Sequence, residues 1–400
     1  QPWQIVVIAG FSGRKVALGG LLASLAVAGW WFYSQRVHRV SMAQYVPASV
    51  LGYIEVNNAP QVIEQLTETK VWRQLAPAYG LSGKLNYAGK LGGLAQFAGA
   101  FGGEATVLAR AQFAVAVTAL EVRGEQVKPR WVLVAETHTS KSSLQSVIDK
   151  RLPELARRAF GDATRVNSEY GGLPLVVYQA VAGEEKQLLS AQLESVWLLA
   201  NHPDAMRACI ETRLGRAPSL ANNFYLQQAR PAVERSGEIF GFITGEGVTR
   251  LLRFGSFLLA GGAIGTVGKA ALGGAVGDIF TDFSSKATNG VAYGVSFENG
   301  AVVDRYALLL KPDLTESLRA SLKVNTQAPR VLSLLPATVR EVTLLNLENP
   351  GQAFGTLETT ISARVGAGQS FILRQFLAGM QEAFFGLRPD ELAARAIGEE

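Results

Sequence analysis

Three histidines and one cysteine are the residues of this 400-residue chain best suited to metal ligation or nucleophilic chemistry. His38, His138 and His202 lie in unrelated contexts, and none has a second ligand at metal-binding spacing. We therefore expect solvated or helix-capping roles for them. A single cysteine excludes an internal disulfide, a thiolate metal cage and a Cys-x-x-Cys-His haem attachment site. The small and apolar residues around Cys209 predict a buried thiol on a helix.

The segment 263–270, AIGTVGKA, approaches a phosphate-binding loop but departs from that motif at two places. Alanine replaces the first glycine, and Ala270 follows Lys269 where a Ser or Thr hydroxyl would hold magnesium. The chain has no Gly-x-Ser-x-Gly elbow, and no pair of carboxylates stands out from the scattered acids. We predict no cofactor and no enzymatic activity. An active site assembled from distant segments is the alternative.

An uncharged run of 18 residues, 16–33 (VALGGLLASLAVAGWWFY), is long enough for a helix to cross about 27 Å of hydrocarbon. Arg14 and Lys15 precede the run, and aromatic residues of the kind found at headgroup level end it. A cleaved signal peptide is the alternative, because Ala26-Val27-Ala28 fits a small-residue cleavage site. We favour a retained anchor, whose principal residues are Leu21, Leu22, Leu25, Val27, Trp30, Trp31, Phe32 and Tyr33.

The orientation of this anchor is weakly specified, because basic residues flank both ends of the run. We expect a short cytoplasmic N-terminus in the bacterial inner membrane, with the main body on the periplasmic side. The chain begins with Gln1 rather than methionine, so we expect its natural start to lie further upstream.

The composition favours contact with lipid or protein over contact with nucleic acid. The chain is 48% hydrophobic and 18% charged, whereas an ordinary soluble domain has about 25% charged residues. Part of the surface is therefore predicted to face lipid or another protein. The net charge of +5 is spread along the chain without a concentrated basic stretch, which argues against a nucleic-acid partner.

An apolar strand followed by a polar cap and an amphipathic helix occurs three times in the body. Strands are predicted at 51–56, 196–200 and 239–243, each followed by a helix. Two hairpins accompany them. One joins 291–297 to 301–310 through a turn containing Asn299-Gly300, and the other joins 113–122 to 130–136. The predicted class is α+β, with antiparallel sheets and helices on one face.

A longer repeat is indicated by two similar openers. Val46-Pro47-Ala48-Ser49-Val50, a strand and Asn58-Ala59-Pro60 are echoed by Leu335-Pro336-Ala337-Thr338-Val339, a strand and Glu348-Asn349-Pro350. The predicted organisation is an N-terminal membrane anchor at 1–40, a first α+β unit at 41–325 and the start of a second repeat at 326–400, which the chain leaves incomplete.

These openers, a Gly103-Glu104 pair before a second strand and the late strand-Asn-Gly-strand hairpin resemble an uncharacterised bacterial domain-of-unknown-function family. The resemblance covers roughly residues 41–325 and again the last 75 residues. It implies a single-pass, membrane-anchored, exported protein. It supplies no catalytic residues that could be carried over to this chain.

The Gly-rich apolar stretch 254–280 contains two Gly-x-x-x-Gly spacings that let helices approach closely. Three interpretations are open: an element packed on the sheet, a surface that docks onto a partner or lipid, and a second membrane span. The residues of a docking surface would be Phe257, Leu258, Leu259, Gly261, Ile264 and Gly265.

The predicted function is that of a non-catalytic accessory or scaffolding subunit of a bacterial membrane complex, with photosynthetic and respiratory complexes as candidates. Its partners would be the lipid bilayer and other subunits of that complex. A membrane-tethered protein that binds a lipid or another hydrophobic ligand is one alternative. An enzyme of unknown type is the other.

Overall fold

The computed structural model describes residues 39–79, 104–123, 126–181, 186–234, 239–263, 266–319 and scattered positions between 356 and 371. The predicted anchor at 16–33 and the second opener at 335–350 lie outside these residues. Among the helices that the structure describes, none combines the length and the apolar character needed to cross a lipid bilayer.

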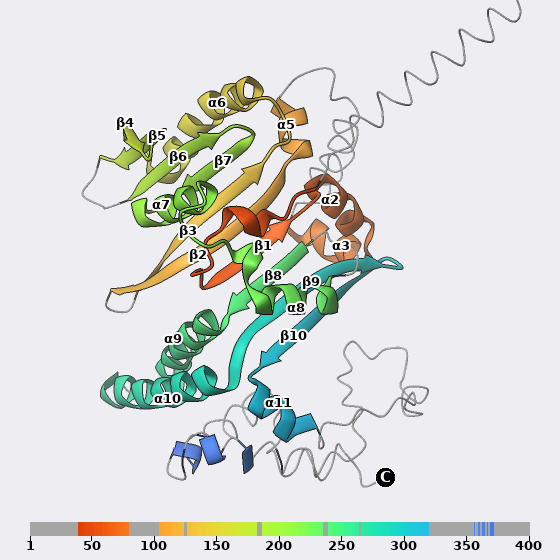
Figure 1. Cartoon of the computed structure of the whole chain (residues 1–400), viewed down its shortest axis with the longest axis vertical. Helices are drawn as coiled ribbons and strands as arrows, with labels where there is room; N and C mark the ends of the chain where they lie inside the picture. Colours follow the sequence, from red (N-terminus) through yellow and green to blue (C-terminus); the bar gives the residue numbers. More distant parts are fainter. Residues whose placement is uncertain are drawn as a thin grey trace, which may run out of the picture.

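One antiparallel sheet of ten strands dominates the fold and confirms the predicted α+β class (Figure 1). Its order is β10-β9-β8-β1-β2-β3-β7-β6-β5-β4, so the two edges are β10 and β4. The strands are β1 (Gly52–Val56), β2 (Gln112–Arg123), β3 (Gln126–Glu136), β4 (Ala163–Tyr170), β5 (Leu173–Ala180), β6 (Gln187–Leu193), β7 (Val196–Ala200), β8 (Ile239–Thr244), β9 (Thr288–Glu298) and β10 (Ala301–Leu310).

Helices lie on both faces of this sheet. The described helices are η1 (Met42–Tyr45), α2 (Ala59–Glu68), α3 (Lys70–Leu75), η2 (Ala76–Tyr79), α5 (Glu104–Arg110), α6 (Lys141–Phe160), α7 (Pro203–Arg213), η3 (Leu220–Asn222), α8 (Phe224–Val233), α9 (Gly245–Ala263), α10 (Thr266–Ala287) and α11 (Pro312–Arg319). The first core lies under η1, α7, η3 and α8, and the second core lies under α5 and α6.

The expectation that helices cover one face was therefore wrong, and β7 shows the reason. All five residues of β7 are buried. Val196 and Leu198 belong to the first core, whereas Trp197 and Leu199 belong to the second. Successive side chains of a strand point to opposite faces, so a strand apolar at every position needs cover on both sides.

The three predicted strand-cap-helix units are confirmed, and each helix begins with a capped amide. The side chain of Asn58 accepts a hydrogen bond from Gln61 N at 3.3 Å before α2. Nδ1 of His202 accepts from Asp204 N at 3.1 Å before α7, which confirms the capping role expected for this histidine. Thr244 Oγ1 accepts from Gly247 N at 3.1 Å at the start of α9. These caps satisfy amides that have no partner within the helix.

The turn of the late hairpin lies where it was predicted. Asn299 and Gly300 both have positive φ, 52° and 76°, as a two-residue turn between paired strands requires. In the other hairpin, β3 begins four residues before the predicted Arg130 and includes Pro129. Proline is tolerated there because β7 pairs with β3 only from Val132 onward, so this part of β3 has one neighbouring strand.

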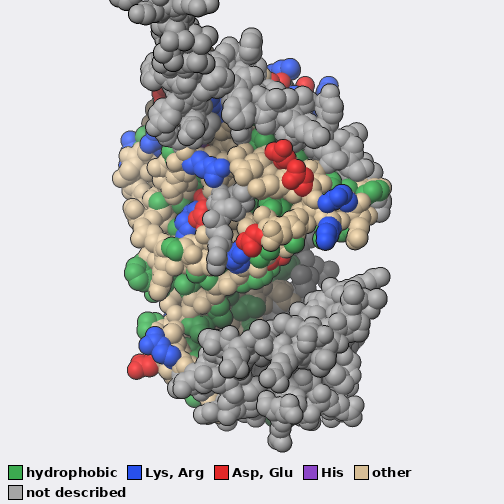
Figure 2. Space-filling view, turned by 90° about the vertical axis from the view of Figure 1, so that its right-hand side faces the viewer, with side chains coloured by type: hydrophobic (Ala, Val, Ile, Leu, Met, Phe, Trp, Pro, Cys, Tyr) green, Lys and Arg blue, Asp and Glu red, His purple; other side chains and the backbone are tan. Residues whose placement is uncertain are grey.

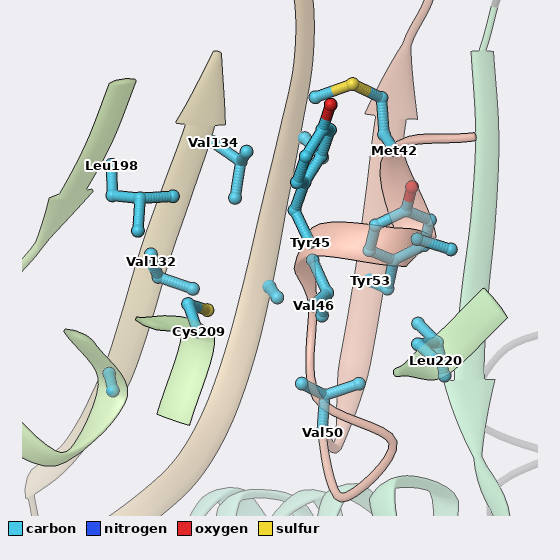
Figure 3. Packing of buried hydrophobic residues seen from close by; sticks show 14 of the residues in the cluster. Met42, Tyr45, Val46, Val50, Tyr53, Val132, Val134, Leu198, Cys209 and Leu220 are labelled. Atoms are coloured by element: carbon cyan, nitrogen blue, oxygen red, sulfur yellow. The ribbon is translucent and has the colours of Figure 1, made fainter. Parts of the chain in front are cut away.

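Cys209 lies on α7 in the first core and is fully buried, as predicted. Burial raises the pKa of this thiol to about 12. Figure 3 shows the middle of that core, where the segment that precedes β1 packs against the sheet. The residues labelled there include Tyr45, Val46, Val50, Tyr53, Val132, Val134, Leu198 and Cys209.

The Gly-rich stretch forms two helices, α9 and α10, inserted between the neighbouring strands β8 and β9 (Figure 1). Ser284 of α10 donates a hydrogen bond to Thr249 Oγ1 of α9 at 3.0 Å, near the sheet. Gly247 lets α9 begin close to the strands, because a Cβ at this position would collide with the carbonyl oxygen of Leu51.

Candidate functional site

Three buried polar side chains meet at one end of three adjacent strands. Glu55 lies near the end of β1, Gln112 begins β2 and Glu136 ends β3. The strand register pairs Gln112 with Glu136 and Val56 with Phe113, so the three positions are neighbours. Their exposed fractions are 1%, 0% and 5%. Burial of such polar groups costs free energy unless they are hydrogen-bonded. The hydrogen-bond partners of these three side chains therefore indicate the role of this end of the sheet.

Gln112 is the centre of a group that we call the Gln112 cluster. Its side-chain Oε1 accepts a hydrogen bond from Val40 N at 2.8 Å, and its Nε2 donates to Val40 O at 3.0 Å. Nε2 also donates to Asn57 Oδ1 at 2.7 Å. The side-chain amide of Gln112 therefore bonds both the N–H and the C=O of Val40, as a residue of a neighbouring strand would. The cluster consists of Val40, Tyr45, Asn57, Gln112, Glu136 and His138.

His138 and Tyr45 complete this cluster. His138 Nε2 lies 2.9 Å from Gln112 Oε1. Because that oxygen is an acceptor, Nε2 carries the proton in this arrangement. The backbone N–H of His138, a residue with φ of 51°, donates to Glu136 Oε1 at 3.0 Å. Tyr45 OH donates to Glu136 Oε2 at 2.8 Å. Burial and this bond to Glu136 raise the pKa of Tyr45 well above its ordinary value.

An adjoining ion-pair group, the Glu55 cluster, consists of Tyr53, Glu55, Arg230 and Glu234. An Arg230 guanidinium nitrogen lies 2.5 Å from Glu55 Oε1 and 3.0 Å from Glu234 Oε2. Tyr53 OH donates to the other oxygen of Glu55. Asn57 Nδ2 donates to Glu55 Oε1 at 3.1 Å and so links the two clusters.

The charges of the Glu55 cluster stabilise one another in the first core. Burial raises the pKa of Tyr53 well above its ordinary value, and the neighbouring Glu55 carboxylate raises it further. Burial opposes the positive charge of Arg230, but the hydrogen bond and charge of Glu55, with the charges of Glu234 and Tyr53, together outweigh burial and raise the pKa of Arg230. The guanidinium also stacks over the ring of Phe240, 4.0 Å from its centroid.

The chemical capacity of these clusters is to hold backbone and strands in place. Each carboxylate oxygen of Glu55 and Glu136 bonds another group of the protein. Within the described ranges, no group of three or more His, Cys, Asp or Glu side chains is arranged to hold a metal ion. The Gln112 cluster therefore holds Val40 against the sheet, and the Glu55 cluster connects α8 to β1.

A pocket of about 200 Å³ lies where α7 meets β4, β5 and β6. Arg207 of α7 stacks over Tyr170 at its rim, 5.4 Å from the ring centroid. The volume is below the roughly 300 to 1,000 Å³ of ordinary ligand sites. It suits a ligand smaller than a lipid.

The predicted site residues lie in two segments of the chain, 21–33 and 257–265. Leu21, Leu22, Leu25, Val27, Trp30, Trp31, Phe32 and Tyr33, like His38, lie outside the residues that the structure describes. Ile264 and Gly265 also lie outside them. The backbone positions of Phe257, Leu258, Leu259 and Gly261 belong to α9.

Neither polar cluster was predicted from the sequence. Their only local signal is the position of Glu55, Gln112 and Glu136 at or beside the ends of predicted strands. Polar residues are common at strand ends, where water can solvate them. The signal therefore distinguishes a buried cluster from a solvated edge only when the neighbouring strands are known.

Comparison with protein-family models, curated proteins and solved structures finds no match to this chain.

Proposed function

We propose that this protein is a non-catalytic accessory or scaffolding subunit of a membrane complex, tethered by residues 16–33 and acting through its α+β body. The observation that carries the proposal is the double hydrogen bond between Gln112 and Val40. It fixes the chain to the sheet a short distance after the apolar run. A body that must keep one end toward a bilayer needs such a fixed attachment.

The linker between the apolar run and the sheet is short. Seven residue steps separate Tyr33 from Val40, and fully extended they span at most about 24 Å. An anchor ending near Tyr33 would keep the Gln112 cluster close to the membrane surface. Lateral diffusion in the membrane plane would then raise the effective concentration of the body near other membrane proteins.

The α9–α10 helices extend from the opposite end of the sheet. Val56, near the Gln112 cluster, pairs with Ile239 at the start of β8, and β8 ends at Thr244 immediately before α9. β9 begins directly after α10, and its 11 residues span roughly 35 Å. In the proposed orientation these helices point away from the anchor. This placement favours a protein partner over lipid for the Gly-rich stretch.

We also propose the organisation that the sequence predicts, with an anchor at 1–40, a first unit at 41–325 and the start of a second repeat at 326–400. The opener at 335–350 would start a second unit that follows the described body. The periplasmic side of the inner membrane is the proposed location of the body, with the bilayer and other complex subunits as partners.

Membrane fractionation of cells that produce the full chain tests the anchor. We expect the native chain to stay with the membranes after a high-salt and an alkaline wash. Ala23→Arg together with Ala26→Arg should release the chain, because charge inside a spanning helix is costly. Val181→Arg is the matched control, because Val181 is 65% exposed on the body. Unchanged membrane retention of the double variant would refute the tether.

A further inference from the structure

The helix pair α2–α3 lies at the end of the sheet where Gln112 holds Val40. Asn57, which also bonds Gln112, comes two residues before α2. At the start of α3, Lys70 N donates a hydrogen bond at 3.2 Å to Gly300 O, in the turn between β9 and β10. That turn is at the same end of the sheet, because β1, β8 and β9 pair antiparallel in turn. Figure 1 shows α2 and α3 between the end of β1 and this turn.

The position of α3 on the folded body is fixed and close to Val40. α2 has ten residues and is therefore about 15 Å long. Thr69 joins the two helices without a loop, since its hydroxyl accepts from Trp72 N at 3.1 Å and donates to Leu66 O at 2.7 Å. α3 therefore lies near the point at which the proposed anchor joins the body.

The exposed side of α3 is apolar, and its neighbours are basic. Val71 and Leu75 are four positions apart, on one face of the helix, and are 52% and 53% exposed. Ala76, on the opposite side, is buried. The helix carries two exposed basic residues, Lys70 and Arg73, and no acidic residue. Apolar side chains beside basic ones are typical of a surface that lies in the headgroup region of a bilayer.

The charges of the body are too mixed to orient it against a membrane. Figure 2 shows Lys and Arg side chains interspersed with Asp and Glu side chains on the face that it views. Interspersed charges give no extended field of one sign, and salt screens exposed charges beyond about 10 Å. Apolar contact near the anchor is therefore the stronger means of orientation. Leu108 of α5, three residues before Ala111 and the start of β2 at this end, is a further exposed apolar side chain.

We propose that Val71 and Leu75 enter the headgroup region of the bilayer and form a second point at which the body meets the membrane. The inference rests on the proposed tether, because so small an apolar surface binds too weakly to hold the body on a membrane alone. The tether raises the effective concentration of lipid at α3. Lys70 and Arg73 lie at the level of the lipid phosphates, where an anionic surface attracts them.

Two points of contact set the orientation of the body. A linker of seven residue steps from Tyr33 to Val40 would by itself leave the body free to rotate. Contact through α3 holds the Gln112 end of the sheet toward the bilayer. The α9–α10 helices leave the sheet at its other end and therefore point away from the lipid. The basic neighbours of Val71 and the position beside Val40 favour lipid over a protein partner for α3.

Site-directed fluorescence of the full chain in vesicles of phosphatidylcholine and phosphatidylglycerol tests the contact. Leu75→Cys carries an environment-sensitive dye, while the one native cysteine, Cys209, is buried and stays unlabelled. We expect emission at shorter wavelength than from a water-exposed label, and quenching by phospholipid with a nitroxide near its headgroup. Val71→Cys should behave in the same way. Val181→Cys is the matched control, because Val181 is 65% exposed and follows β5 at the opposite end of the sheet.

The possible results separate this contact from the tether. A Leu75 label quenched no more than the Val181 label would overturn the inference. Emission at shorter wavelength without quenching would also overturn it, because a protein surface would then cover α3. A chain that does not enter the vesicles would refute the tether and this inference together, whereas an incorporated chain with an unquenched label refutes the contact alone. Circular dichroism verifies the fold of each variant, and the Val71 label decides the matter if Leu75→Cys does not fold.

Discussion

The side-chain amide of Gln112 bonds both the N–H and the C=O of Val40, which lies 72 residues earlier in the chain. The same amide contacts Asn57 and His138. One side chain thus joins the segment before η1 to the ends of β1, β2 and β3. The arrangement is costly to disturb, because loss of the amide removes four hydrogen bonds at half-buried positions at once.

Replacement of Gln112 by leucine should lower the free energy of unfolding by about 2 to 4 kcal/mol, because the backbone of Val40 and the side chains of Asn57 and His138 each lose a hydrogen bond to the amide. Urea denaturation of the full chain in mild detergent measures the change. Gln145→Leu is the control, because Gln145 bonds Asp149 on the exposed side of α6. A loss at Gln112 no larger than that of the control would contradict the proposed attachment.

Glu55 and Arg230 should show strong energetic coupling. Arg230→Met leaves a buried carboxylate without its cation and should cost about 3 to 5 kcal/mol. The combined Glu55→Gln and Arg230→Met variant should be more stable than the sum of the single effects predicts, as measured by a double-mutant cycle. The exposed pair Glu246 and Arg250 serves as the control, since its coupling should stay below about 0.5 kcal/mol. Additive effects at Glu55 and Arg230 would show that the pair is not coupled.

Stability should fall as the pH rises above 10, partly because of Tyr53. The ordinary tyrosine pKa is 10.0, and the pKa of folded Tyr53 is raised well above it. The unfolded chain therefore releases this proton at a lower pH than the folded chain does. The stabilising contribution is complete below pH 10 and is lost as the pH rises toward the folded pKa. Tyr53→Phe should flatten the dependence of urea midpoints on pH between 10 and 11. An unchanged slope would contradict this assignment.

Cys209 should resist thiol reagents in the folded chain. Its pKa of about 12 against an ordinary value of 9.0 leaves roughly a thousandfold less thiolate at pH 8, and burial blocks access. Labelling with a chromogenic disulfide should be negligible until urea unfolds the protein. Labelling at equal rates with and without urea would show that the thiol is accessible.

Two glycines of α9 should respond in opposite ways to alanine. Gly247→Ala should destabilise the body, because its methyl group would collide with the carbonyl oxygen of Leu51. Gly255→Ala has open space around the added methyl group, and alanine in a helix is favoured by about 0.5 to 1 kcal/mol. Thermal unfolding of both variants measures the difference. Equal effects would mean that α9 does not approach β1 this closely.

Local signals were sufficient for the helices and turns of this protein. Asn58 and His202 each cap the helix that follows them within three residues, and Asn299-Gly300 turns the chain within two. Such signals act between near neighbours in the chain, so each can be recognised from a few consecutive residues. The three strand-cap-helix units and the late hairpin were predicted for this reason.

The order of the strands, the cover on both faces and the two polar clusters were decided by the tertiary structure. Glu55 and Arg230 are 175 residues apart, and nothing in either local sequence indicates the other. A contact of this kind forms only when distant strands and helices have closed large loops against the entropy of the chain. Short stretches of sequence therefore encode the individual elements and an apolar run that could anchor them. The packing of ten strands decided which polar side chains became buried together and which strands lie at the edges of the described sheet, because those properties belong to pairs of segments and not to either segment alone.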